Sequence, residues 1–243
     1  RDLHLSLRRQ RQMCIRDRNV KYISEAAKKE GIKVLLSGAG GDDLFTGYRR
    51  HLATKLDDYI EVLPKFIRQN MEYISKNLDL NNSSYRRLAK FFQGSSLEGE
   101  ERLINYFIWT PRKDLLNLFN KEVRGIVEDQ DPTNTMQSYL DTLDAGLDNL
   151  DKMLALEQRF FLTDHNLNYT DKMSMSEGVE VRVPLLDLEL LKYSYEIPNK
   201  LKQKGREGKW IFKKAMEGIK ALTNKLRTET VAVIHSAYED SPR

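Results

Sequence analysis

The chain has 243 residues, with 40 Lys or Arg against 36 Asp or Glu, so its formal net charge is +4. With 40% hydrophobic and 31% charged residues, the composition is typical of a folded globular protein and excludes a disordered one. No run of about 18 apolar residues predicts a membrane-spanning helix. The single cysteine, Cys14, excludes an intrachain disulfide and a cysteine-cluster metal site. We therefore expect a cytoplasmic protein.

The net charge is concentrated at the N-terminus. Residues 1–18 carry six arginines against two aspartates, and residues 19–243 are balanced. A basic arm of this kind is typical of nucleic-acid or membrane binding, but we interpret 1–18 as a disordered or non-native tail. Residues 9–18 resemble translated sequencing adapter, and Arg8 to Gln12 leave no room for the apolar region of a secretion signal.

The first informative segment predicts one unit of an α/β fold. Apolar residues at helical spacing predict a helix over 19–30, which Gly31 ends. Residues 32–36 form a short apolar, β-branched run that predicts a buried strand. A glycine-rich loop, 37–41, follows, and Asp42 or Asp43 is expected to cap a new helix that continues through Phe45 and Tyr48.

The centre of the chain, from 51 to 168, has a predominantly helical pattern. We expect interruptions at Pro64, 81–84, 93–96 and 129–135, and a helix with Pro111 as its first residue. The stretch 147–167 predicts a long amphipathic helix, with four core residues: Met153, Leu156, Phe160 and Phe161.

The alternation in residues 179–183 places Glu180 and Arg182 on one face, and it indicates either an exposed strand edge or the wall of a loop. Pro184 is expected to start a helix over 185–196, which Pro198 ends. A Glu–Arg pair in a cleft can orient a substrate carboxylate. The alternative is a surface ion pair, and the spacing leaves both interpretations open.

The loop 37–41 is the strongest candidate for phosphate chemistry. Its glycines allow backbone N–H groups to approach a ligand closely, and a helix N-terminus favours anions. Asp42 and Asp43 would repel bare phosphate, but a Mg²⁺ ion could bridge carboxylate and phosphate oxygens. Alternatively, the glycines form a tight turn and the aspartates only cap a helix. Neither a P-loop nor a dinucleotide-binding glycine motif is present.

Two segments together resemble the glutamine-dependent asparagine synthetases. Residues 37–49, SGAGGDDLFTGYR, resemble the family loop SGxGGDExFxGYxR, and residues 171–187, DKMSMSEGVEVRVPLLD, resemble its segment DRxSMAxxxExRxPFLD. The resemblance covers about 19–218. It implies an α/β fold of the adenine nucleotide α-hydrolase-like (PP-loop) type, in a truncated and predominantly helical synthetase domain.

The resemblance also implies a reaction and roles for residues. ATP would adenylate the aspartate β-carboxylate, and ammonia from an upstream glutaminase domain would then displace AMP. The loop residues would lie against ATP (Ser37, Gly38, Ala39, Gly40 and Gly41). Asp42 would bind Mg²⁺, and Asp42, Glu180 and Arg182 would serve catalysis, the last two at the aspartate pocket. We expect ATP and Mg²⁺ as cofactors, a homodimer as the candidate assembly, and no nucleic-acid or membrane partner.

Several departures from the family pattern qualify this interpretation. Ala39 stands where the family often has an acid, and the PP-loop Ser-Gly-Gly-x-Asp-Ser is absent. Residues 219–243 lack the expected lysine near Gly-Phe-Gly, so we interpret them as an atypical, non-native tail that follows a frameshift or misassembly. We expect the isolated chain not to make asparagine. The alternatives are an amidotransferase acting on a sugar, peptide or antibiotic precursor, and a non-catalytic helical nucleic-acid-binding protein with a basic arm.

Overall fold

The computed structural model describes residues 15–79 and 81–226, so most of the expected basic tail and the end of the expected C-terminal tail lie outside the described residues. The described chain divides into two compact units. The residues up to Gly47 and from Glu157 onward form the first, here called the sheet unit. Residues Tyr48–Leu156 form the second, here called the helical unit. The sheet unit is therefore discontinuous in sequence.

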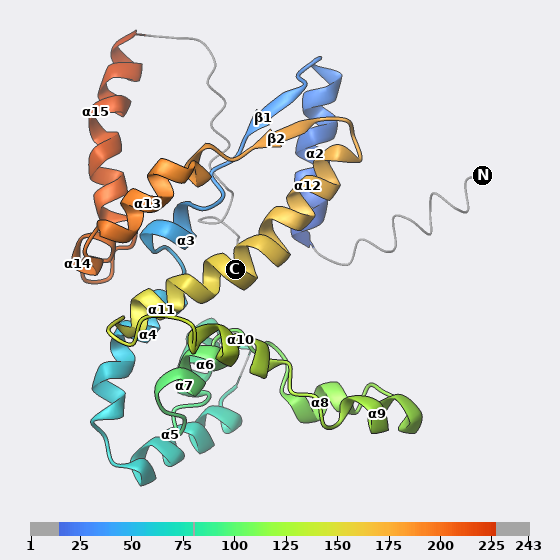
Figure 1. The fold of residues 1–243 in the computed structure, drawn as a ribbon, viewed down its shortest axis with the longest axis vertical. Helices are drawn as coiled ribbons and strands as arrows, with labels where there is room; N and C mark the ends of the chain where they lie inside the picture. The colour runs from blue at the N-terminus through green and yellow to red at the C-terminus, as the bar shows by residue number, and fades with distance from the viewer. Residues whose placement is uncertain (1–14, 80, 227–243) are drawn as a thin grey trace. The chain divides into compact units, whose positions relative to one another are not determined.

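Two short parallel strands form the centre of the sheet unit. Strand β1 (Val34–Leu36) pairs with β2 (Glu180–Arg182), with Val34 opposite Glu180 and Leu36 opposite Arg182. The strand at β1 was predicted from sequence, and of the two alternatives for residues 179–183 the structure has the exposed strand. The prediction that β1 is buried was wrong, because Val34 and Leu36 are exposed among the described residues. Helices α2 (Ile15–Lys29) and α12 (Asn168–Met175) pack together beside this sheet (Figure 1).

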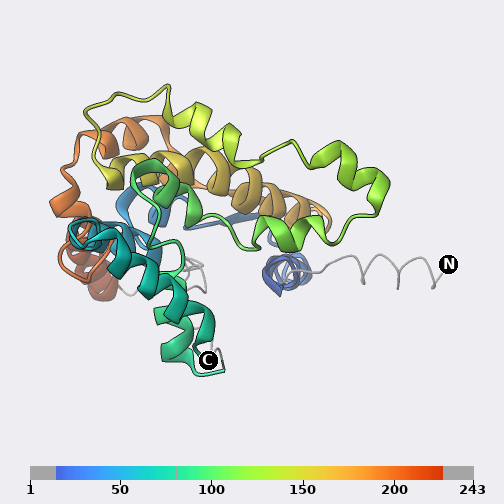
Figure 2. The ribbon, with the colours of Figure 1, turned by 90° about the horizontal axis from the view of Figure 1, so that it is seen from below.

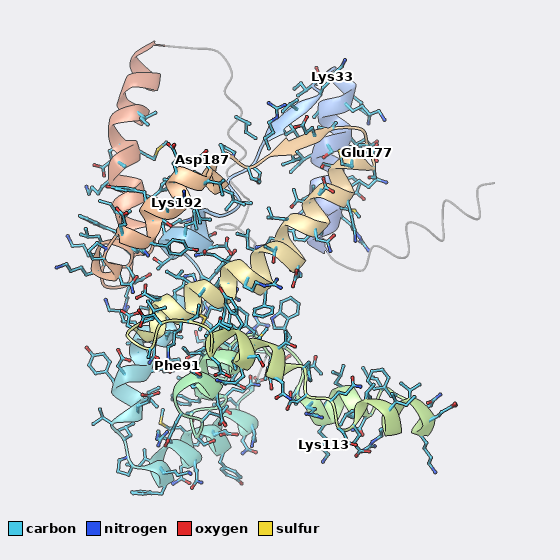
Figure 3. The ribbon with its side chains drawn as sticks, viewed as in Figure 1. Lys33, Phe91, Lys113, Glu177, Asp187 and Lys192 are labelled. Atoms are coloured by element: carbon cyan, nitrogen blue, oxygen red, sulfur yellow. The ribbon has the colours of Figure 1, made fainter. Side chains whose placement is uncertain are left out.

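The pairing of α2 with α12 depends on small buried residues. Ser24 and Ala27 of α2 and Ser174 of α12 are buried, and small side chains allow two helix backbones to approach closely. Lys21 of α2 forms an ion pair of 3.3 Å with Glu177, at the end of α12 (Figure 3). Gly31 adopts φ 74° after α2, which confirms the predicted glycine stop.

One face of the sheet is open among the described residues. Leu35 and Val181 are half-buried, whereas Val34, Leu36, Glu180 and Arg182 are exposed. Parallel strands are normally covered on both faces. The described chain thus fits an α/β fold that is mostly helical and carries little of its sheet.

The helix after the glycine loop differs from its prediction. Helix α3 spans only Gly41–Phe45, and its N-cap is Gly40 in the left-handed conformation, so neither Asp42 nor Asp43 caps it. Thr46 has φ 66° and ends the helix before Tyr48. The prediction was wrong because backbone packing around Thr46, described below, overrides the local helical pattern.

The remaining elements of the sheet unit lie within residues 157–226. They are η1 (Glu157–Leu167), the 3-10 turn η2 (Pro184–Leu186), α13 (Leu188–Glu196), α14 (Asn199–Lys202) and α15 (Trp210–Leu226). The expected helix over 185–196 therefore begins later. Asp187 caps α13 by accepting hydrogen bonds from the backbone N–H groups of Glu189 and Leu190 (Figure 3).

The predicted amphipathic helix over 147–167 divides into two types of helix. Residues Asn149–Leu156 form α11 of the helical unit, and η1 is a π-helix. Hydrophobic spacing does not distinguish the wider π turn from an α turn, so this difference was missed. Met153, Leu156 and Phe161 are buried as predicted, and Phe160 is half-buried.

The helical unit contains eight described helices, as the predominantly helical pattern predicts. They are α4 (Arg49–Glu61), α5 (Lys65–Asn77), α6 (Ser83–Phe92), α7 (Gly99–Asn105), α8 (Arg112–Leu116), α9 (Lys121–Val127), α10 (Thr133–Leu140) and α11. Pro111 is the N-cap of α8 rather than its first residue. Helices α4, α7, α10 and α11 enclose the apolar core, which includes Leu103, Leu140 and Met153.

A charged network connects α4 to α7 inside this core. Arg102 donates to Asp57 from Nε (3.3 Å) and Nη2 (3.1 Å), and Nη2 also lies 2.7 Å from the carbonyl oxygen of Phe91 (Figure 3). Tyr106 donates its hydroxyl hydrogen to Asp57 at 2.7 Å. Burial raises the pKa of Asp57 above its ordinary value, although Arg102 and Tyr106 act in the opposite direction. The network is almost fully buried, so each member depends on the others.

Helices α8 and α9 form a hairpin that extends from the rest of the helical unit (Figures 1 and 2). Arg112 closes its base. It forms an ion pair with Asp131 at 2.7 Å and donates to the carbonyl oxygens of Glu128 (2.6 Å) and Gln130 (3.0 Å). None of the residues of α8 or α9 is buried.

We expect Arg112→Met to open the hairpin while lowering the free energy of unfolding of the whole unit by no more than about 1 kcal/mol, because the closing bonds are partly solvated. Limited proteolysis with thermolysin should cut the hairpin at least about threefold faster, because proteases act on locally opened segments. Lys113→Met removes the same charge from the neighbouring residue (Figure 3) and should leave the rate unchanged. Equal rates for the two variants would contradict the closing role.

No helix in the described parts of the chain is both long and apolar enough to cross a membrane.

Candidate functional site

The glycine-rich loop 37–41 lies at the carboxyl end of β1. The backbone N–H of Ser37 donates to the carbonyl oxygen of Arg182 at 2.8 Å, which continues the pairing of β1 with β2. The N–H of Ala39 then donates to Ser37 Oγ at 3.2 Å, so the chain turns directly after the strand. The sheet therefore brings together two predicted site segments, the loop and the strand that carries Glu180 and Arg182.

Two glycines allow the loop to rest on the chain that follows β2. Gly40 has φ 89°, and a Cβ atom there would lie 2.3 Å from Leu186 Cδ2. A Cβ on Gly41 would lie 3.1 Å from Leu185 Cδ1. A left-handed conformation and the close contact together require glycine at position 40.

Helix α3, which follows the loop, is held from two sides. Gln158 Nε2 of η1 donates to the carbonyl oxygen of Asp43 at 3.2 Å, and Tyr195 of α13 donates to Gln158 Oε1. The ring of Phe45 stacks on that of Phe212 in α15, with centroids 5.3 Å apart. The side chains of α3 thus have fixed positions relative to the start of α15.

Asp42 of α3 forms an ion pair with Lys209, the residue before α15. Asp42 Oδ1 and Lys209 Nζ are 2.9 Å apart, and the two side chains are only 17% and 19% exposed. The backbone N–H of Lys209 donates to the carbonyl oxygen of Phe45 at 3.0 Å and to Thr46 Oγ1 at 3.3 Å. This packing also explains why α3 ends at Phe45, because Thr46 turns to meet the 208–209 backbone.

Gly47 and Gly208 make this close approach sterically feasible. A Cβ on Gly208 would lie 3.0 Å from the carbonyl oxygen of Thr46 and 3.2 Å from Gly47 Cα. A Cβ on Gly47 would lie 1.6 Å from Asp42 Oδ1. The carboxylate of Asp42 therefore occupies the space that any side chain at position 47 would need.

A basic hollow of about 420 Å³ lies beside this ion pair, hereafter the basic hollow. Its lining consists of Gly47, Arg206, Glu207, Gly208, Lys209 and Lys213. Glu207 pairs with Lys213 at 3.3 Å, and the hollow keeps an excess of positive charge. The long helix α15 begins at its wall, so the partial positive charge of a helix N-terminus adds to that excess. Lys209 and Lys213 each have a carboxylate partner, so the excess is small, and the arrangement is suited to an anion.

Glu180 and Arg182 form an exposed ion pair within β2. Glu180 Oε1 and Arg182 Nε are 2.9 Å apart, and the side chains are 55% and 63% exposed. The hydrogen bond between them holds the pKa of Glu180 below its ordinary value and raises the pKa of Arg182. Both charges lie on the open face of the sheet. Their predicted place in a substrate pocket stays a prediction.

The residues present fit a metal only in combination with phosphate. Among the described residues, no group of three or more His, Cys, Asp or Glu side chains gathers as a metal site. Asp42 offers one carboxylate, and Mg²⁺ in nucleotide sites is commonly held by one or two carboxylates plus phosphate oxygens. Asp42 therefore fits as one ligand of an ion that arrives with a phosphate group.

Lys209, the partner of Asp42, was not predicted from the sequence. Lysine and arginine recur through the segment that leads into α15, at Lys204, Arg206, Lys209 and Lys213, with glycines at 205 and 208. That combination of basic residues with glycines before a helix is a signal from which an anion site could have been predicted.

The sequence of this chain was compared with a family model and with curated proteins, and the matches agree with one another. The asparagine synthase family model matches residues 16–226. Asparagine synthetase [glutamine-hydrolyzing] 1 of Bacillus subtilis (strain 168) is 26% identical over 200 residues, which is 82% of this chain and 30% of that protein. Asparagine synthetase [glutamine-hydrolyzing] 3 of the same strain is 34% identical over 76 residues, which is 31% of this chain and 12% of that protein.

A second organism gives a match of the same extent. A Mycobacterium tuberculosis (strain ATCC 25618 / H37Rv) protein, provisionally named asparagine synthetase [glutamine-hydrolyzing], is 30% identical over 202 residues, or 82% of this chain and 29% of that protein. This chain thus spans less than a third of the length of the curated relatives it matches. No solved structure matches it.

Proposed function

The chain belongs to the asparagine synthase family, and from that membership we propose that it forms part of the ATP-using domain of a glutamine-dependent asparagine synthetase. In the proposed reaction, the β-carboxylate of aspartate attacks the α-phosphorus of ATP, and pyrophosphate leaves. Ammonia then attacks the acyl carbon of the aspartyl adenylate, which gives asparagine and AMP. Because the chain spans only part of its relatives' length, we assign glutamine hydrolysis to a glutaminase domain in the full-length protein.

The observation that carries this proposal is the basic hollow beside the ion pair between Lys209 and Asp42, a residue of the short helix that follows the glycine loop. A pyrophosphate leaving group develops charge as it departs, and fixed cations near that charge lower the barrier. Arg206, Lys209 and Lys213 supply three such cations, and Lys209 pairs with Asp42, which follows the loop at the carboxyl end of β1. Ligands in parallel α/β proteins commonly bind at that end. This reaction requires positioning and charge neutralisation rather than a nucleophilic side chain.

The proposed roles follow the positions of the residues. Ser37, Gly38, Ala39, Gly40 and Gly41 would hold ATP through backbone groups that approach it closely. Glu180 and Arg182 would border the acceptor acid, with Arg182 offering a planar fork to a carboxylate. Asp42 would contribute one ligand to a Mg²⁺ ion, which would neutralise phosphate charge when bound. Lys209 would hold the departing pyrophosphate.

Isothermal titration of this chain with inorganic pyrophosphate and Mg²⁺ tests the proposal. We expect Lys209→Met to weaken binding at least about tenfold, because a charge-assisted hydrogen bond is lost. The matched control is Lys192→Met, which removes an exposed lysine from α13 (Figure 3) and should leave binding unchanged. Equal effects of the two substitutions, or the absence of any pyrophosphate binding, would refute this site.

The acceptor acid is tested separately in the full-length protein by ATP–pyrophosphate exchange. Aspartate should stimulate exchange more than other carboxylic acids, whereas this chain alone should not support it. Ala39 bears on the chemical step rather than on the acceptor, because a methyl group cannot transfer a proton at a position where the resembled family often has an acid. Stimulation by a different acid would identify an amidotransferase of other specificity.

A further inference from the structure

The ion pair between Asp42 and Lys209 has a consequence for the form of phosphate that the basic hollow accepts. Lys209 Nζ already has a carboxylate partner at 2.9 Å, and both side chains are less than one-fifth exposed. Water and salt screen such a pair less than a surface pair. The ammonium group of Lys209 has further N–H donors, but a phosphate that contacts it meets the negative charge of Asp42.

The carboxylate of Asp42 lies at the edge of the basic hollow itself. Its Oδ1 lies where a side chain on Gly47 would be, and Gly47 lines the hollow together with Lys209. An anion in the hollow would thus lie near a carboxylate as well as near the cations. With Asp42 counted, the three cations Arg206, Lys209 and Lys213 face two carboxylates, because Glu207 also lines the hollow.

We propose that Asp42 is a specificity-determining residue, which keeps Lys209 from free anions and releases it only to a polyphosphate that arrives with a divalent cation. The inference rests on the proposed function, since it concerns the same site. A carboxylate can pair with a lysine or coordinate a cation through the same oxygen. If Asp42 held a divalent cation that neutralised phosphate charge, Lys209 would lose its carboxylate partner and could donate to the phosphate. The site therefore selects metal-bound pyrophosphate or ATP over the free anion.

The test is calorimetric titration of this chain with inorganic pyrophosphate, either with Mg²⁺ or with a chelator. For the unmodified chain, we expect Mg²⁺ to tighten binding at least fivefold. Asp42→Asn should tighten metal-free binding at least threefold, because Lys209 is then free, and should reduce the effect of Mg²⁺ to less than twofold. In the double variant with Lys209→Met, the metal-free gain should disappear.

Glu207→Gln is the matched control, because it removes the other carboxylate of the hollow. It should strengthen metal-free binding through net charge, but it should retain the fivefold effect of Mg²⁺. Gly47→Ala provides a second variant, since its Cβ displaces Asp42 Oδ1 while the charge remains. It should also raise metal-free affinity and weaken the dependence on Mg²⁺.

The outcomes separate this inference from the proposed function. If Asp42→Asn binds pyrophosphate but keeps the full effect of Mg²⁺, or binds the free anion less tightly, the role assigned to Asp42 is wrong and the phosphate site stands. If neither the unmodified chain nor any variant binds pyrophosphate, the proposed function fails, and the inference fails with it.

Discussion

Replacing Arg102 by methionine is expected to lower the free energy of unfolding of the helical unit by about 3–5 kcal/mol at neutral pH. Arg102 is 2% exposed, and its guanidinium contacts Asp57, Tyr106 and the backbone carbonyl oxygen of Phe91. Methionine fills similar volume, so the loss comes mainly from leaving the carboxylate of Asp57 buried without its cation. Amide hydrogen exchange in α4 and α7 measures this loss in the helical unit alone.

The loss should depend on pH in a defined direction. Burial already raises the pKa of Asp57, and Arg102 is the largest influence that lowers it. Without Arg102 the pKa rises further, so the folded variant binds a proton over a wider pH range than the unfolded chain does. Stability then falls as pH rises through that range. The penalty of Arg102→Met should be smaller near about pH 5 than near about pH 8, and adding Asp57→Asn should recover part of it.

Arg68→Met is the matched control for this pH dependence. Arg68 is also a buried arginine, and it donates to the carbonyl oxygen of Leu63 at 3.1 Å, but its carboxylate partner Glu98 is exposed. Because Glu98 stays hydrated, the loss in this variant should be nearly constant between about pH 5 and pH 8. A pH-independent loss for Arg102→Met as well would contradict the burial of an unpaired Asp57 as its cause.

Gly40→Ala should cost about 2–4 kcal/mol of stability in the sheet unit, because left-handed strain and a steric clash combine. Gly31→Ala is the control, since Gly31 has φ 74° but no atom lies within 4 Å of its added Cβ. It should cost only about 1–2 kcal/mol. Urea unfolding of both variants separates strain from clash.

A double variant identifies the clashing group. If Leu186 causes the extra cost, Gly40→Ala combined with Leu186→Ala should be less destabilised than the sum of the two single variants. Strict additivity would show that Leu186 is not the obstacle, and that the loop backbone itself resists the change.

Local signals in the sequence were enough to predict part of the structure around the site. The apolar run before Ser37 indicated a strand, the alternation around Val181 was compatible with one, and Gly31 indicated the end of a helix. Alternation also placed Glu180 and Arg182 on one face. These features depend on residues close together in sequence, which is the range over which periodicity and glycine conformation act.

Features that depend on distant residues were missed. Lys209 meets Asp42 across 167 positions of sequence, and no local pattern links them. The early end of α3 follows from the same packing, because Thr46 and Gly47 adapt to the backbone at Gly208 and Lys209. The π-helix η1 was missed for another reason, since its side-chain spacing resembles that of an α-helix.

The discontinuity of the sheet unit affects the order of events during protein synthesis. Val34 pairs with Glu180, which is 146 residues later in the chain. At a synthesis rate of about 5–20 residues per second, β1 leaves the ribosome roughly 7–30 s before its partner. During that interval the whole helical unit emerges and can fold by itself, while β1 keeps an unpaired apolar edge. Nascent chains that stall before Glu180 should therefore recruit chaperones at β1 and release them once β2 has emerged.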